Sequence, residues 1–108
     1  MDYRRKVIIK RPDEEFGHVT NISTSLENLQ KTVDGPIEMV TLIDSPKTVM
    51  ICNEEGKLRK LDRNFRMCRY FPDIIVGTVI ICGVENEDLA DIPISFDAWK
   101  RLLKSWDN

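Results

Sequence analysis

Histidine and cysteine are scarce in this 108-residue sequence, and their scarcity excludes several kinds of site. His18 is the single histidine, and no second histidine or cysteine lies near it at the spacing of metal ligands, so no zinc or haem site is expected. The three cysteines, Cys52, Cys68 and Cys82, lie 16 and 14 positions apart, which suits neither a disulfide framework nor a redox motif. The sequence predicts free thiols, a reducing compartment and no metal.

Long apolar runs are missing as well. The most hydrophobic stretches, such as 79–82, last four or five residues, whereas a membrane span needs about 20. The apolar run near the N-terminus ends at Lys10 and is too short for a signal peptide. We therefore expect a cytoplasmic protein that neither crosses a membrane nor is secreted.

The motifs of common enzymes are also absent. Neither GxGxxG nor a GxxxxGKS or GxxxxGKT sequence occurs, so a standard cradle for a nucleotide cofactor is missing. The acidic residues at 85–91 lack the ligand order of an EF-hand and are interpreted as a solvated loop. Cys68 lies near two arginines, but no base accompanies it, and a semi-buried packing thiol is the favoured interpretation. His18 is interpreted as a half-exposed strand residue. We predict a non-enzymatic protein without catalytic residues or cofactors.

The sequence does contain the pattern of one folded domain. Apolar residues make up 42% and charged residues 31%, which suits a single core in a chain of this length. Runs rich in β-branched residues predict a hairpin from Lys6–Lys10 and Gly17–Ile22, and a second hairpin from Ile37–Ile43 and Thr48–Cys52. The domain therefore begins with strands that pair locally.

Two more strands are expected in the second half of the chain. Asn53–Gly56 has the composition of a tight turn with Gly56 at positive φ, after which Lys57–Leu61 would return as a short edge strand. The most apolar segment, Asp73–Val84, is predicted as the central strand of the sheet, with Gly77 allowing a bulge or a close approach.

Two helices complete the predicted fold. Thr24 and Glu27 form a capping box, and helical spacing predicts a helix over Ser25–Asp34 that ends at Gly35. Ser95 caps a last helix whose apolar stripe comprises Phe96, Trp99, Leu102, Leu103 and Trp106. The expected core contains Leu26, Leu29, Val33, Ile75, Val79 and Ile81. Residues 1–108 are thus expected to form a single α+β domain with one mainly antiparallel sheet of about five or six strands and two helices.

One segment departs from the overall composition. Between Lys57 and Arg69, six cations accompany a single acid, Asp62, which gives a net charge of +5 in a chain whose total is −2. Arginine presents a planar pair of donors that matches phosphate or carboxylate. A helical turn would place Arg63, Arg66 and Arg69 on one face. The segment predicts an anion-binding surface formed by Arg59, Arg63, Arg66 and Arg69, with Asn53, Asn64 and Tyr70 as selecting residues.

Several interpretations of this basic segment stay open. A solvated edge strand kept basic against aggregation needs no ligand at all. A small anionic ligand such as a nucleotide second messenger is the favoured functional alternative, and the acidic remainder of the chain disfavours nucleic acid. An acidic partner protein would instead contact the basic edge and the exposed part of the helix that carries Trp99 and Trp106. A homodimer or small homo-oligomer is expected, because one small domain offers little concavity.

Motifs along nearly the whole chain resemble one family, catalogued as domain of unknown function 3846. They are GHVTNIS at 17–23, LENLQKTV at 26–33, GPIE at 35–38, NEEGKL at 53–58, Asn64, DIIVGT at 73–78 and SFDAWK at 95–100. The chain departs from the family pattern at Asp62, where a proline is expected, and segment 63–66 is more basic than that pattern.

This resemblance implies a small intracellular protein of bacteria, phages or mobile elements, and it brings no established activity or catalytic residues. In that setting the favoured hypothesis is a phage or prophage counter-defence protein that sequesters an anionic nucleotide signal in the cytoplasm of a bacterial host. The alternative is a module that binds a host or phage protein and inhibits or adapts it.

Overall fold

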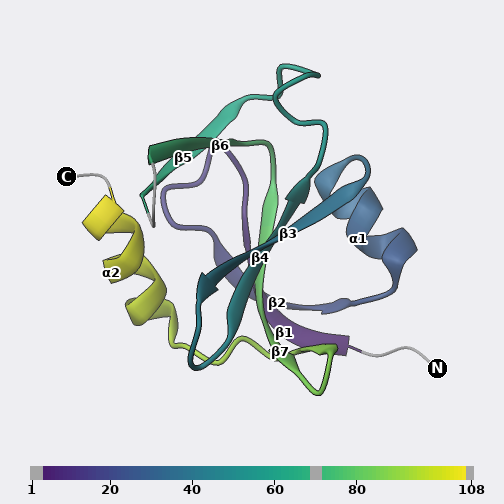
Figure 1. The fold of residues 1–108 in the computed structure, drawn as a ribbon, viewed down its shortest axis with the longest axis vertical. Coiled ribbons are helices and arrows are strands. Elements are labelled where there is room, and N and C mark those ends of the chain that lie inside the picture. The colour runs from purple at the N-terminus through teal and green to yellow at the C-terminus, as the bar shows by residue number, and fades with distance from the viewer. Residues whose placement is uncertain (1–3, 69–71, 107–108) are drawn as a thin grey trace.

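The computed structural model describes residues 4–68 and 72–106 as eight strands and two helices (Figure 1). In chain order the elements are β1 (Arg4–Lys10), β2 (His18–Ser23), α1 (Leu26–Val33), β3 (Ile37–Ile43), β4 (Thr48–Asn53), β5 (Arg63–Cys68), β6 (Pro72–Val76), β7 (Val79–Glu85), β8 (Asp88–Ala90) and α2 (Phe96–Trp106). All the strand pairs are antiparallel, and the predicted α+β class with two helices is confirmed.

The main sheet has the strand order β2-β1-β7-β4-β3, with β8 added beside β7. Both predicted hairpins are present, because β1 pairs with β2 and β3 pairs with β4. Strand β7 joins them: Ile81 lies opposite Ile8 of β1 on one side and opposite Met50 of β4 on the other. The acidic segment predicted as a loop contains β8, which extends the sheet by a short strand.

The two faces of this sheet bury different side chains, since successive residues of a strand point to opposite faces. On one face, Val49 and Ile80 pack with Leu29 and Val33 of α1. On the other face, the residues in the alternate positions pack against the β5–β6 ribbon and α2. Burial is confirmed for five of the six predicted core residues: Leu29, Val33, Ile75, Val79 and Ile81.

The N-terminus of α1 differs from the predicted capping box. Ser25, rather than Thr24, is the N-cap, and its hydroxyl accepts a hydrogen bond from the backbone N–H of Asn28 at 3.2 Å. Because Ser25 still has an extended backbone, the helix begins at Leu26. Leu26 lies in the exposed first turn and is 58% exposed, so its predicted burial is wrong.

Helix α2 docks through its tryptophans. Ser95 caps this helix as predicted. Trp99 is fully buried and donates its Nε1–H to the carbonyl oxygen of Phe16 at 2.8 Å. Trp106 is 7% exposed and stacks on the ring of Phe65. The two tryptophans belong to the core, which agrees with the apolar stripe predicted for this helix.

The predicted central strand over 73–84 is two strands. Gly77, at φ 75°, ends β6 and redirects the chain into β7, so β6 leaves the main sheet and pairs with β5 instead. The predicted close approach at Gly77 is confirmed: a Cβ there would lie 2.8 Å from Cδ1 of Leu61, and its N–H donates to the carbonyl oxygen of Asp62 at 2.8 Å. The apolar run alone carried no sign of this break, because both halves are apolar.

The predicted edge strand over 57–61 is a series of turns. The N–H of Arg59 donates to the carbonyl oxygen of Glu55 at 2.9 Å, and the N–H of Leu61 donates to that of Gly56 at 3.0 Å. These local bonds replace a strand ladder. The residue at positive φ is Lys60, at 55°, and the prediction for Gly56 is wrong.

Candidate functional site

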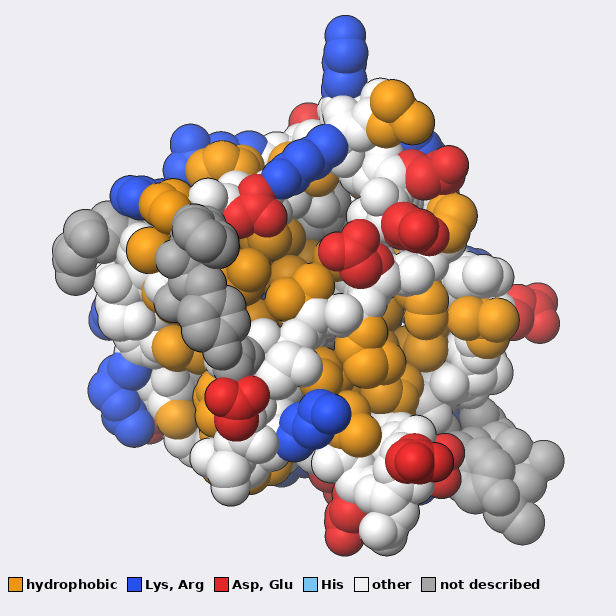
Figure 2. All heavy atoms as spheres, in the orientation of Figure 1, with side chains coloured by type: hydrophobic (Ala, Val, Ile, Leu, Met, Phe, Trp, Pro, Cys, Tyr) orange, Lys and Arg blue, Asp and Glu red, His pale blue; other side chains and the backbone are white. Residues whose placement is uncertain are grey.

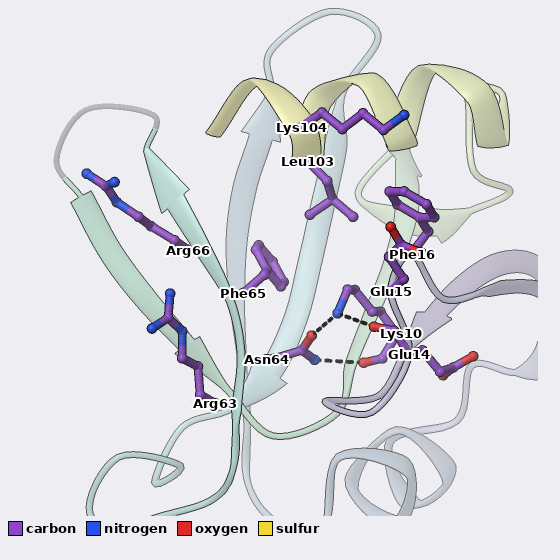
Figure 3. Close-up of a pocket in the computed structure, with 10 residues that line it drawn as sticks. All are labelled: Lys10, Glu14, Glu15, Phe16, Arg63, Asn64, Phe65, Arg66, Leu103 and Lys104. Carbon is purple, nitrogen blue, oxygen red and sulfur yellow. Dashed lines mark hydrogen bonds between the residues drawn. The ribbon is translucent and has the colours of Figure 1, made fainter. Parts of the chain in front are cut away.

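A groove of about 330 Å³ runs between β5, the loop that precedes β2, and helix α2 (Figure 3). Within the described chain β5 pairs with β6 alone, so its other edge borders this groove. The lining residues are Lys10, Glu14, Glu15, Phe16, Arg63, Asn64, Phe65, Arg66, Leu103 and Lys104. Segments far apart in the sequence therefore share one concave surface.

Lys10 and Asn64 form the floor of the groove. Lys10 is 3% exposed, and its Nζ donates to Oδ1 of Asn64 at 2.5 Å and to the carbonyl oxygen of Glu14 at 2.7 Å. Asn64 returns the contact, because its Nδ2 donates to the carbonyl oxygens of Lys10 at 2.8 Å and Gly77 at 2.7 Å. The contacts among Lys10, Glu14 and Asn64, which are dashed in Figure 3, tie β1 to the start of β5. The side chain of Asn64, predicted as a selecting residue, is thus used to hold the floor in place.

Two of the predicted arginines lie along this groove. Figure 3 shows Arg63 and Arg66 at the rim of the groove, on one side of β5 and pointing away from its floor, while Phe65 extends toward α2. The strand brings them together, not the predicted helical turn. Neither guanidinium has an ion pair or hydrogen bond with any other residue in the described ranges. Arg63 is exposed and Arg66 is half-buried, so both remain accessible to a ligand.

Glu14, one of the two carboxylates that line the groove, interacts with residues close to it in the chain. Glu14 accepts from the backbone N–H of Arg11 at 2.9 Å and lies 2.8 Å from Nδ1 of His18. Burial alone would raise the pKa of Glu14, but the hydrogen bonds and positive charge of Arg11 and His18 outweigh it and lower the pKa. His18 is a half-exposed strand residue, as predicted, and its partner is this carboxylate.

Two predicted ligand residues lie elsewhere, at the C-terminus of α1. The Nδ2 of Asn53 donates to the carbonyl oxygens of Val33 at 3.1 Å and Asp34 at 2.9 Å. Arg59 donates to the same Asp34 carbonyl and forms an ion pair with its carboxylate at 3.0 Å. Both side chains cap a helix, so the structure does not bring them to the groove. The other two predicted residues, Arg69 and Tyr70, lie outside the described residues.

The thiols differ in accessibility. Burial raises the pKa of Cys52 to about 11 and that of Cys82 to about 12. Cys68 is exposed, so the prediction of a semi-buried packing thiol is wrong there. Among the residues that the structure describes, no three His, Cys, Asp or Glu side chains gather as a metal site would require.

Sequence reasoning missed Lys10, Phe16 and Lys104. In the sequence, Lys10 ends an apolar strand and is typical of an exposed strand terminus. Lys104 is typical of a solvated helix residue. No local signal connects three positions so far apart. Strand β5 was detectable, since Phe65 and Met67 alternate with polar neighbours at the period of a strand.

The fold and the groove define a small α+β protein with a concave basic surface beside an edge of β5. The chain belongs to the family described as Domain of unknown function (DUF3846), whose model matches residues 5–104. This match confirms the family resemblance and covers nearly the whole chain. No curated protein and no solved structure matches it. Neither of the two described helices is long and apolar enough to span a membrane.

Proposed function

We propose that this protein is a non-enzymatic binding protein that captures an anionic ligand of the nucleotide class in the β5 groove. Its setting, from the family resemblance, is the cytoplasm of a bacterial host, where a phage or prophage product would sequester a nucleotide signal. The observation that carries the proposal is the pair Arg63 and Arg66, which border one groove without a protein counter-ion in the described chain.

The charge of the groove supports an anion. Four cationic residues and two carboxylates line it, which leaves a formal excess of two positive charges in a chain of net charge −2. Two lysines of α2, Lys100 and Lys104, have their Nζ atoms 5.6 and 5.4 Å from the ring centre of Phe16. Lys100 also pairs with Asp97 at 3.5 Å and does not line the groove, so the proposal depends on Arg63 and Arg66, whose planar guanidinium groups match phosphate oxygens.

The experiment is calorimetry with a panel of linear and cyclic nucleotides, followed by heating of the complex and identification of the released ligand. We expect one ligand class to bind and to be recovered unchanged. Arg63→Ala and Arg66→Ala should each weaken its binding about tenfold to a hundredfold, as expected for a charge-assisted hydrogen bond. Arg101→Ala, an exposed arginine of α2 outside the groove, is the matched control. Absence of binding would refute the proposal, and a hydrolysed ligand would show an enzyme.

A second function is favoured by the edge of β5. Four consecutive residues, 63–66, line the groove, and an extended acidic segment of another protein would add to this edge as a strand. A pulldown that recovers an acidic protein, combined with no nucleotide binding and loss of capture in Arg66→Ala, would support this interaction module instead.

A further inference from the structure

A second concave surface lies between the main sheet and the β5–β6 ribbon. It is a hollow of about 380 Å³ whose apolar floor is formed by Val40, Met50, Met67 and Ile75. On the face of the molecule seen in Figure 2, apolar side chains gather in hollows, with charged side chains around them. Val40 is half-buried and the other three floor residues are at most 9% exposed, so an apolar side chain that enters the hollow would have apolar neighbours around it.

The rim of this hollow is acidic. Glu38, Glu54, Asp73 and Lys57 border it. Lys57 forms an ion pair with Asp73, which leaves Glu38 and Glu54 without an ion-pair partner in the described part of the chain. An occupant that matches the hollow therefore combines an apolar group with a positive charge.

The same chain presents such a group beside the hollow. Leu58 is 82% exposed, more than any other large hydrophobic residue in the described ranges. It stands in the turn of residues 57–60, here named the Leu58 turn, in which the other three residues are cationic. Arg59 is paired with Asp34, whereas Lys60 has no ion pair with any described residue. The Leu58 turn thus offers an apolar tip and an available positive charge.

We infer that the hollow receives the Leu58 turn of a second copy of this chain, which gives a symmetric dimer. The turn and the hollow are neighbours, because Lys57 belongs to both. If a two-fold axis passes between them, the Leu58 turn of each copy lies against the hollow of the other copy. Both contacts then form together, and the assembly closes as a dimer. Leu58 enters the apolar floor, and Lys60 approaches Glu54 and Glu38. This inference is independent of the ligand proposed for the β5 groove.

Charge reversal provides the sharpest test, with sedimentation equilibrium as the measurement. We expect the wild-type chain to dimerise at about 10 to 100 µM. Glu54→Lys and Lys60→Glu should each be monomeric at the same concentration, because both symmetric contacts then bring like charges together. Mixed in equal amounts, the two variants should dimerise again, since each turn then meets a hollow of opposite charge. Lys31→Glu on α1 is the matched control and should dimerise like the wild type.

Leu58→Ser tests the apolar part of the contact without a risk to folding, because this side chain is largely outside the core. It should weaken the dimer at least about a hundredfold, as two buried leucines are lost. A wild-type chain that is monomeric throughout the concentration range would overturn the inference, and so would a dimer that tolerates both charge reversals. Saturable binding of hexylammonium by a monomer, lost in Glu54→Lys, would assign the hollow to a small cationic amphiphile and likewise overturn it.

Discussion

Lys10 ends the apolar strand β1, and its ammonium group lies in the interior of the protein. Removing such a group from water is costly unless it is hydrogen-bonded, and here Asn64 and the Glu14 carbonyl supply acceptors. The Nζ also lies 5.7 Å from the ring centre of Phe65, which adds a cation–π contact. A buried lysine with this much local support fixes where β5 lies against β1.

Substitution of Asn64 measures this support. Asn64→Ala removes an acceptor of Lys10 and the donor to two backbone carbonyls, and it should lower the free energy of unfolding by about 1 to 3 kcal/mol. Urea denaturation followed by circular dichroism gives the value. The control is Asn21→Ala, an exposed position on β2. Equal stability of the two variants would show that the floor of the groove does not depend on Asn64.

The lowered pKa of Glu14 predicts that the protein loses stability in acid. Its pKa in the folded protein lies below the ordinary 4.5, so its contribution is fully present above that pH and is lost as the pH falls through the folded pKa. Thermal unfolding between pH 7 and about pH 3 should therefore show a smaller acid destabilisation in Glu14→Gln than in the wild type. Parallel curves for the two proteins would contradict the role given to Arg11 and His18.

At the scale of the elements, local pattern determined most of what was predictable. The hairpins β1–β2 and β3–β4 follow from runs of β-branched residues with short connections, and both helices follow from caps and apolar spacing. The break at Gly77 was not predictable, because β6 and β7 are both apolar and their different partners are encoded far away in the sequence. The groove escaped prediction for the same reason: Lys10, Arg66 and Lys104 meet only through the pairing of distant segments.

The contribution of helix α2 to stability can be measured by substitution of Trp99. Trp99→Ala would leave a cavity under the helix and abolish the hydrogen bond to the Phe16 carbonyl. The free energy of unfolding should fall by about 3 to 5 kcal/mol. Chemical denaturation of this variant and of Arg101→Ala, an exposed position on the same helix, gives the comparison. A loss below about 1 kcal/mol would mean that α2 is peripheral.

At the scale of the whole molecule, the charge is unevenly distributed. The residues outside 57–69 have a net charge of −7, since the segment itself has +5 and the chain −2. A ligand held by Arg63 and Arg66 would thus approach a molecule that repels anions over most of its surface. Only the cations of the groove would attract an anionic ligand, and salt screens this attraction.

Salt dependence therefore tests where the ligand binds. If a nucleotide occupies the β5 groove, raising the salt concentration from about 50 mM to 500 mM should weaken its binding, because exposed charges are then screened within a few ångströms. The slope against salt concentration should be smaller in Arg63→Ala, which has one cation fewer, than in Arg101→Ala. Calorimetry at several salt concentrations gives both slopes. Equal slopes would place the ligand away from Arg63.

The central position of β7 determines the order in which this sheet is completed during synthesis. The hairpins β1–β2 and β3–β4 are encoded early, yet β1 and β4 meet only through β7, at residues 79–85. While the ribosome is still making that strand, the emerging chain exposes two apolar edges that lack their shared neighbour. The last third of the protein therefore converts two separate hairpins into one sheet, and a chain released before residue 79 would retain edges that pair readily with other chains.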